Sequence, residues 1–176
     1  MKILILGTAR HGKDSLAELL NEYFGMTYKS SSEMANEMFI YETIKDEYNY
    51  NSIEECFEDR VNHRSLWYKL ICFYNREDKA KLAKDIISKY DCYVGMRDYE
   101  EFKASKNLFD IIIWVDASKR LGNSEITNKI SIEDAHIVVH NNGTFEEFQE
   151  KAKVIGKLLF KNVKKKNKES FIAKVL

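Results

Sequence analysis

The sequence predicts an α/β protein, with a mostly parallel sheet of about five strands in a three-layer arrangement and helices on both faces. Short apolar runs alternate with stretches of helical periodicity, an order typical of parallel strands joined by right-handed crossovers. The runs are apolar almost throughout, as strands buried on both faces require. No proline and no low-complexity linker interrupts the 176 residues. One domain is therefore expected over residues 1–160, followed by a basic tail at 161–176.

The chain begins with a buried strand and an amphipathic helix. The apolar run stops at Gly7, and Leu16, Leu19 and Leu20 then follow at helical spacing. Gly25 suits the C-cap of this helix. The expected elements are a strand at 2–6, a helix at 13–23, a short strand at 26–28, a turn at 30–32 and a new helix from Glu33.

The middle of the chain is expected to be helical. Ser52 and Glu55 have the spacing of a capping box, and apolar residues from Phe57 to Tyr74 follow a roughly helical period. We therefore expect one long helix that ends near Tyr74. A second helix is expected at 78–90, where the same periodicity recurs.

In the second half of the chain, the sequence predicts three further strands and a C-terminal helix. The run 92–95 stops at a glycine, 110–115 is the clearest buried strand, and 136–140 is the last strand. A short helix is expected at 100–106. Thr144 and Glu147 form another capping box, which opens a helix to about Leu159. Residues 117–131 are polar and irregular.

Composition limits the kinds of ligand and location. The chain has 28 basic and 28 acidic residues, so a local basic cluster must hold any anion. Three cysteines at wide spacings fit neither a disulfide framework nor a zinc site, and we expect reduced core thiols. No apolar run approaches the roughly 20 residues of a membrane span. These features predict a soluble, cytoplasmic protein without a membrane partner.

The segment 7–15 has the spacing of a phosphate-binding loop. Gly-x-x-x-x-Gly-Lys lies between a buried strand and a helix, so backbone N–H groups and the helix N-terminus face a phosphate, and Lys13 can reach the β- and γ-phosphates. Asp14 replaces the usual Ser/Thr ligand of Mg²⁺ and Ser15 follows, so either can serve the metal. The predicted binding residues for ATP and Mg²⁺ are Gly7, Arg10, His11, Gly12, Lys13, Asp14 and Ser15.

Several blocks of sequence are shared with one family. They are Gly7–Asp14, Ser30–Ser32, Glu58–Arg64, Tyr93–Arg97, Trp114–Ser118 and Asn141–Thr144. On these blocks, and over most of its length, the chain resembles phage deoxynucleoside monophosphate kinases. The loop is common to many families, whereas the blocks that contain Arg60 and Arg97 are more discriminating.

The resemblance implies a P-loop nucleoside triphosphate hydrolase/nucleotide kinase fold. It further implies ATP- and Mg²⁺-dependent phosphoryl transfer to a deoxynucleoside monophosphate, which gives the diphosphate, in the host cytoplasm if the protein is phage-encoded. Residues 30–90 would then form an acceptor-binding helical region and 117–131 a lid-like segment. The protein could be a monomer or a homodimer.

Arginines are the candidates for contact with the transferred and acceptor phosphates, because a guanidinium grips phosphate in a bidentate way. Arg97 follows a strand at the ligand edge of the sheet, and the resemblance assigns it to the acceptor. Arg60 and Arg64 share a face if the middle helix is continuous, either as an anion clamp or as a solvated face paired with Asp59. Arg120 is a candidate lid residue or an ordinary loop residue.

Asp116 and several other side chains have two interpretations each. Asp116 ends the most apolar strand, where it can support the metal or cap the following turn. His136 and His140 face the same side of a strand but lack a third metal ligand nearby. Aromatic residues can stack on a base or belong to the core: Trp67, Tyr68, Phe73, Tyr74 and Trp114.

Two alternative functions stay open. A kinase for a hydroxymethyl pyrimidine in phage DNA would need a carboxylate base, for which Asp14, Glu33 and Asp59 are candidates. Lysines of the tail would then contact DNA phosphates: Lys161, Lys164, Lys165, Lys166 and Lys168. The second alternative is a non-catalytic nucleotide-binding protein, which the displaced Ser/Thr of the loop permits.

Overall fold

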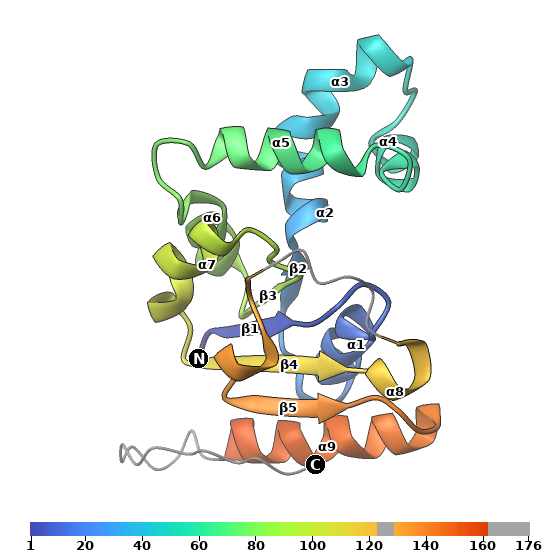
Figure 1. Cartoon of the computed structure of the whole chain (residues 1–176), viewed down its shortest axis with the longest axis vertical. Helices are drawn as coiled ribbons and strands as arrows, with labels where there is room; N and C mark the ends of the chain where they lie inside the picture. The colour runs from blue at the N-terminus through green and yellow to red at the C-terminus, as the bar shows by residue number, and fades with distance from the viewer. Residues whose placement is uncertain (123–128, 162–176) are drawn as a thin grey trace.

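The computed structural model describes residues 1–122 and 129–161. Within them, five parallel strands form one sheet in the order β2-β3-β1-β4-β5 (Figure 1). The predicted α/β class, with a parallel sheet of about five strands, is confirmed. The strands are β1 (Ile3–Leu6), β2 (Tyr28–Ser30), β3 (Cys92–Val94), β4 (Ile111–Asp116) and β5 (Ile137–His140).

Helices cover both faces of the sheet because successive side chains of each strand point to opposite sides. Ile3 and Ile5 of β1 pack toward α1 and α9, whereas Leu4 and Leu6 pack toward α2, α6 and α7. These four side chains are at most 1% exposed, and each contributes about 1.5–3 kcal/mol by its burial. The helices are α1 (Lys13–Phe24), α2 (Ser31–Ala35), α6 (Lys81–Lys89), α7 (Tyr99–Ser105) and α9 (Phe145–Lys161).

A helical region with its own small core lies beside the sheet. Its buried centre consists of Ala35, Ile40, Ile44, Cys56 and Trp67. Figure 1 shows α3, α4 and α5 above the sheet, to which α2 connects them. The elements are the π-helix η1 (Asn36–Ile40), α3 (Tyr41–Tyr48), α4 (Ile53–Asp59) and α5 (Arg64–Tyr74).

The prediction of one long middle helix is wrong, because residues 60–63 form a turn between α4 and α5. The Asp59 carboxylate accepts hydrogen bonds from Asn62 Nδ2 at 2.6 Å and from the Tyr50 hydroxyl at 2.6 Å. It also pairs with Nε2 of His63 at 3.0 Å. These contacts favour the turn over a continuous helix, so Arg60 does not share a helical face with Arg64.

The structure also differs from the expected positions of the second strand and of the turn that follows it. β2 lies two residues later than predicted, and the expected serine turn is the end of β2 and the start of α2. The cause is a capping box: the Ser30 side chain accepts from the backbone N–H of Glu33, whose carboxylate accepts from the backbone N–H of Ser30. The helix therefore begins at Ser31 and not at Glu33.

The polar segment after β4 contains short helices. They are α8 (Ser118–Leu121) and the 3₁₀ turn η3 (Ile132–Asp134), and another 3₁₀ turn, η2 (Lys106–Leu108), precedes β4. Part of the proposed lid, 123–128, and the basic tail from 162 onward lie outside the described residues. In the part of the chain that is described, no helix has the length and apolar character to cross a membrane.

Candidate functional site

The candidate site lies at the carboxyl ends of the strands, where ligands bind in open parallel sheets. β1 is the middle strand, with β3 on one side and β4 on the other. The strand arrows in Figure 1 point to one edge, and the loop 7–12 leaves β1 at this edge and enters α1. The predicted phosphate loop therefore lies at the centre of the ligand edge.

Two glycines of the loop occupy positions that a larger residue would disturb. Gly7 has φ +143°, and a Cβ there would lie 2.4 Å from the carbonyl oxygen of Val115. Gly12 has φ +100°, and a Cβ there would lie 2.5 Å from Nδ2 of Asn141. Arg10 is exposed with φ 66°, a left-handed conformation that costs a non-glycine residue roughly 1 kcal/mol. The loop is thus held close to the ends of β4 and β5.

His11 is a buried residue of the loop that forms hydrogen bonds with residues outside it. Its side chain is 2% exposed, and its Nδ1 accepts a 3.0 Å hydrogen bond from the backbone N–H of Ala117. Its own carbonyl oxygen accepts a 3.0 Å bond from Asn141 Nδ2. Burial lowers the pKa of His11, although nearby Asp116 opposes the shift. The imidazole therefore joins the loop to the end of β4, and the His11 carbonyl oxygen joins it to the end of β5.

Lys13 begins α1 and folds back over the loop. Its Nζ donates a 2.8 Å hydrogen bond to the carbonyl oxygen of Thr8. Burial lowers the pKa of Lys13 to about 8, Asp14 opposes this shift and Arg97 adds to it. Gly12 is the N-cap of α1 and has no side chain that could cap the first turn. The free N–H groups, the helix dipole and Lys13 together suit a phosphate.

Asp14 and Ser15 lie in the first turn of α1, as the loop spacing requires. Asp14 is exposed and Ser15 is half-buried. Both have oxygen atoms, which Mg²⁺ prefers as ligands. Among the described residues, no group of three His, Cys, Asp or Glu side chains is placed to hold a metal ion. A bound Mg²⁺ would therefore depend on oxygen atoms of the nucleotide as well as of the protein.

Arg97 interacts electrostatically with Lys13 of this loop and with two further arginines. Arg97 lies in the segment between β3 and α7, Arg60 in the turn after α4, and Arg64 at the start of α5. Partial burial lowers the pKa of Arg97, the positive charges of Arg64 and then Arg60 lower it further, and Asp14 opposes them. The fold thus brings three cationic side chains from two other parts of the sequence, Lys13, Arg60 and Arg64, within electrostatic range of Arg97.

Arg60 and Arg64 are not paired with Asp59, which was the alternative to an anion clamp. Asp59 pairs with His63. Arg60 donates from one guanidinium nitrogen to the carbonyl oxygen of Phe57 at 2.7 Å, and its guanidinium lies 3.8 Å from the centre of the Phe57 ring. This contact fixes the arginine while other N–H groups stay available.

Two residues beside Lys13 were absent from the predicted site. A Cβ on Gly95 would lie 3.9 Å from both Lys13 Cε and Ser31 Oγ, and the Ser31 hydroxyl donates a 3.1 Å bond to the Gly95 carbonyl oxygen. The Ser30–Ser32 block and the glycine that ends β3 were visible in the sequence. Neither showed that Gly95 lies between Ser31 and the lysine.

Asp116, at the end of β4, is 9% exposed and accepts several hydrogen bonds. Its Oδ1 accepts from the backbone N–H of Ser118 at 3.0 Å, and its Oδ2 lies 2.9 Å from Nδ1 of His140 and 3.4 Å from Nδ2 of Asn142. Burial opposes ionisation, but these hydrogen bonds outweigh it and lower the pKa of Asp116 to about 2. The carboxylate therefore caps the turn into α8.

The Asp116 carboxylate should make stability depend on pH. Because its folded-state pKa lies below its ordinary value of 3.8, it stabilises the fold above pH 4, and this stabilisation is lost as the pH falls toward 2. We expect the wild-type chain to lose about 2 kcal/mol of unfolding free energy over this range relative to Asp116→Asn. Urea unfolding of both proteins at several pH values measures the difference, and parallel pH profiles would contradict the prediction.

The remaining candidates lie at the margins of the site. Arg120, in α8, is exposed, and its Nε donates to the carbonyl oxygen of Asn141 at 3.4 Å, so it lies near the end of β5. His136 Nδ1 accepts from the backbone N–H of Ile112, whereas His140 contacts Asp116, so the two histidines do not share a ligand. Trp67 and Trp114 are buried.

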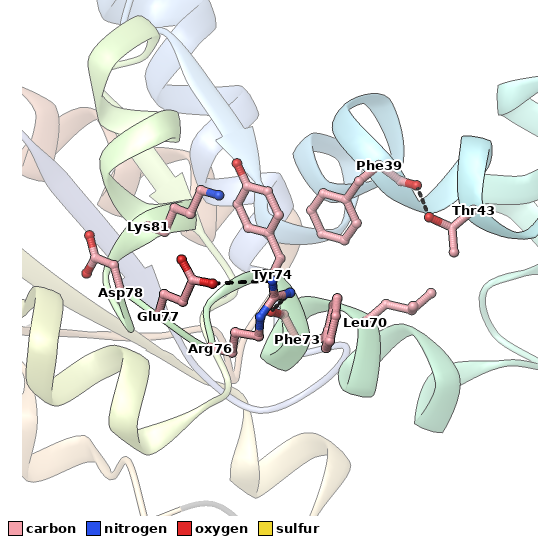
Figure 2. A pocket seen from close by; sticks show the side chains of 9 residues that line it. All are labelled: Phe39, Thr43, Leu70, Phe73, Tyr74, Arg76, Glu77, Asp78 and Lys81. Atoms are coloured by element: carbon pink, nitrogen blue, oxygen red, sulfur yellow. Dashed lines mark hydrogen bonds and ion pairs between the residues drawn. The ribbon is translucent and has the colours of Figure 1, made fainter.

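A cavity of about 520 Å³ lies away from the loop, at the end of α5 (Figure 2). Tyr74 stacks on Phe39 with ring centres 4.5 Å apart, and Arg76 lies over the ring of Phe73. Arg64 begins the same helix, about 15 Å away along its axis. The lining residues are Phe39, Thr43, Leu70, Phe73, Tyr74, Arg76, Glu77, Asp78 and Lys81. This cavity and the cationic cluster are therefore separate features.

Comparison with known proteins adds no family to this geometry. The chain matches no protein-family model and no curated protein sequence. Its function must be inferred from its residues and their arrangement.

Proposed function

We propose that this protein is a P-loop nucleotide kinase, which transfers the γ-phosphoryl group of ATP to a deoxynucleoside monophosphate in the presence of Mg²⁺. The main support is that Arg97 interacts electrostatically with Lys13, in the loop after β1, and with Arg64 and Arg60. Like charges repel, so such a cluster is costly in the free protein unless an anion binds there. A reaction between two phosphate groups supplies that anion.

The loop side of the site suits the triphosphate. Gly7 and Gly12 allow the backbone to approach phosphate, and Lys13 neutralises charge on the β- and γ-phosphates. Ser15 or Asp14 would hold Mg²⁺, which would act as a Lewis acid and withdraw negative charge from the phosphates. His11 keeps the loop in place, since its imidazole is committed to Ala117.

The arginine side suits the acceptor. Arg97, Arg64 and Arg60 bind the phosphate of the monophosphate and orient one of its oxygens toward the γ-phosphorus. That oxygen forms the new P–O bond, while the bond from the γ-phosphorus to the β,γ-bridging oxygen breaks and its electron pair stays on ADP. The acceptor oxygen is already anionic and needs no strong general base. The products are ADP and a deoxynucleoside diphosphate.

A DNA hydroxyl acceptor has less support. It needs a carboxylate base, and two of the three candidates are engaged elsewhere. Glu33 accepts from the backbone N–H and the hydroxyl of Ser30, and Asp59 accepts from Tyr50 and Asn62. Asp14 is the candidate that stays exposed. The lysines at 164–168 lie outside the described residues.

One assay separates the candidate functions. The full chain is incubated with Mg²⁺ and γ-labelled ATP, with a panel of deoxynucleoside monophosphates and with hydroxymethylated DNA in parallel. We expect label in a deoxynucleoside diphosphate. Label in DNA alone would instead support the base kinase. ATP binding without transfer to either acceptor would support the non-catalytic alternative.

A further inference from the structure

A buried carboxyl group lies behind the segment that carries Arg97. Glu101, in the first turn of α7, is 2% exposed, and Tyr93, in the middle of β3, is fully buried. The Tyr93 hydroxyl donates a 2.8 Å hydrogen bond to Oε1 of Glu101. Phosphoryl transfer makes no direct use of either side chain. Burying a carboxyl group is nevertheless unfavourable, so this pair lowers the free energy of unfolding relative to apolar residues at the same positions.

The Tyr93–Glu101 hydrogen bond closes the base of the segment that carries Arg97. Tyr93 precedes this segment in β3, and Glu101 follows it in α7. Asp98, the N-cap of α7, strengthens the same end, because its Oδ1 accepts a 2.8 Å bond from the backbone N–H of Glu101. The short segment around Arg97 is therefore fastened where it leaves the sheet and where it enters the helix.

The segment between Tyr93 and Glu101 also lies beside the lysine of the loop. Burial and then the negative charge of Glu101 raise the pKa of Tyr93. The Ser31 hydroxyl donates to the Gly95 carbonyl oxygen at 3.1 Å. Ser31 Oγ and Lys13 Cε each lie 3.9 Å from the position that a Cβ on Gly95 would take. The segment between Tyr93 and Glu101 is therefore bonded to Ser31 through Gly95 and lies beside Lys13.

We propose that Tyr93 and Glu101 are positioning residues that hold Arg97 and Ser31 in place for the phosphate of the acceptor. This inference rests on the proposed kinase function. Neither residue touches the substrates, and both act through the segment between them. Because a displacement of about 1 Å in a phosphate-binding group can lower the rate by orders of magnitude, the support matters for binding and turnover of the acceptor.

Glutamine is a close substitute for Glu101. Burial raises the pKa of Glu101 to about 7; the hydrogen bond from Tyr93 opposes this shift and the negative charge of Asp98 adds to it. Cys72 of α5 is another titratable group that interacts with this carboxyl. Near neutral pH the side chain is therefore partly uncharged. Glutamine keeps an oxygen that can accept from Tyr93, whereas alanine removes the contact.

Kinetics of four variants of the full chain test the proposal. Tyr93→Phe and Glu101→Ala are expected to raise the KM for the monophosphate about tenfold, with the KM for ATP within about twofold of wild type. Glu101→Gln should retain a nearly wild-type KM for the monophosphate. Tyr74→Phe is the matched control, because it removes a tyrosine hydroxyl that donates to Asp85 at 2.7 Å, away from the loop.

Amide hydrogen exchange provides a measurement that does not depend on activity. Exchange over residues 95–101 should be faster in Tyr93→Phe and Glu101→Ala than in wild type and Tyr74→Phe. Unchanged exchange and an unchanged KM for the monophosphate in Tyr93→Phe, with active wild-type protein, would overturn the positioning role alone. A wild-type chain that transfers no phosphate would overturn the proposed function, and with it the acceptor role of the pair.

Discussion

Replacing Lys13 by alanine is expected to lower the rate of phosphoryl transfer by roughly 10²–10³-fold, the usual effect of removing one group that stabilises transition-state charge. Lys13 is the cation of the loop itself, and its Nζ donates a 2.8 Å hydrogen bond to the Thr8 carbonyl oxygen. The fold should persist, because the variant removes a charge whose burial is unfavourable. Single-turnover assays with γ-labelled ATP measure the loss.

A matched control for this variant is Lys84→Ala, which removes a surface lysine that pairs with Asp78 at 2.7 Å. It should transfer phosphate at the wild-type rate. The pH dependence offers a second check, because the pKa of Lys13 is lowered to about 8. The kcat/KM for ATP should therefore fall above about pH 8, as the free enzyme loses this charge. Full activity in Lys13→Ala would refute the assignment of the loop.

The sequence predicted the parts of the molecule that depend on neighbouring residues. Apolar runs gave the strands of a parallel sheet, because a strand buried on both faces must be apolar along its length. The position of the loop was predicted for a similar reason, because Gly7, Gly12 and Lys13 have a fixed spacing along one strand–helix connection. The turn after Asp59 could not be predicted in this way. It depends on the Tyr50 hydroxyl, which comes from outside the apparent helix.

The rest of the site depends on contacts between distant segments. Spacing suggested that Arg60 and Arg64 cooperate on one helix, whereas the fold brings them toward Arg97 by way of a turn. His11 was grouped with the ligand-binding residues because of its place in the loop. Its burial against Ala117 follows from how β4 ends beside the loop, a tertiary feature that periodicity does not encode.

The support for a monophosphate acceptor depends most on Arg97, since it interacts with both other arginines and with Lys13. Arg97→Ala is expected to lower kcat/KM for the monophosphate by roughly 10²–10³-fold, because it removes a bidentate phosphate contact in the transition state. The KM for ATP should change little. Steady-state kinetics with each substrate varied in turn separate the two effects.

The role of Arg97 can also be tested by melting temperature, with Arg76→Ala as a control variant. Removing an arginine that two other arginines repel should leave the melting temperature of the free protein unchanged or slightly higher. Inorganic phosphate should raise the melting temperature of wild type more than that of Arg97→Ala, because an anion that binds the native state stabilises it. Arg76→Ala, at the far end of α5, should behave as wild type in every assay. Equal loss of ATP and monophosphate binding in Arg97→Ala would contradict a role on the acceptor side and place this arginine with the triphosphate.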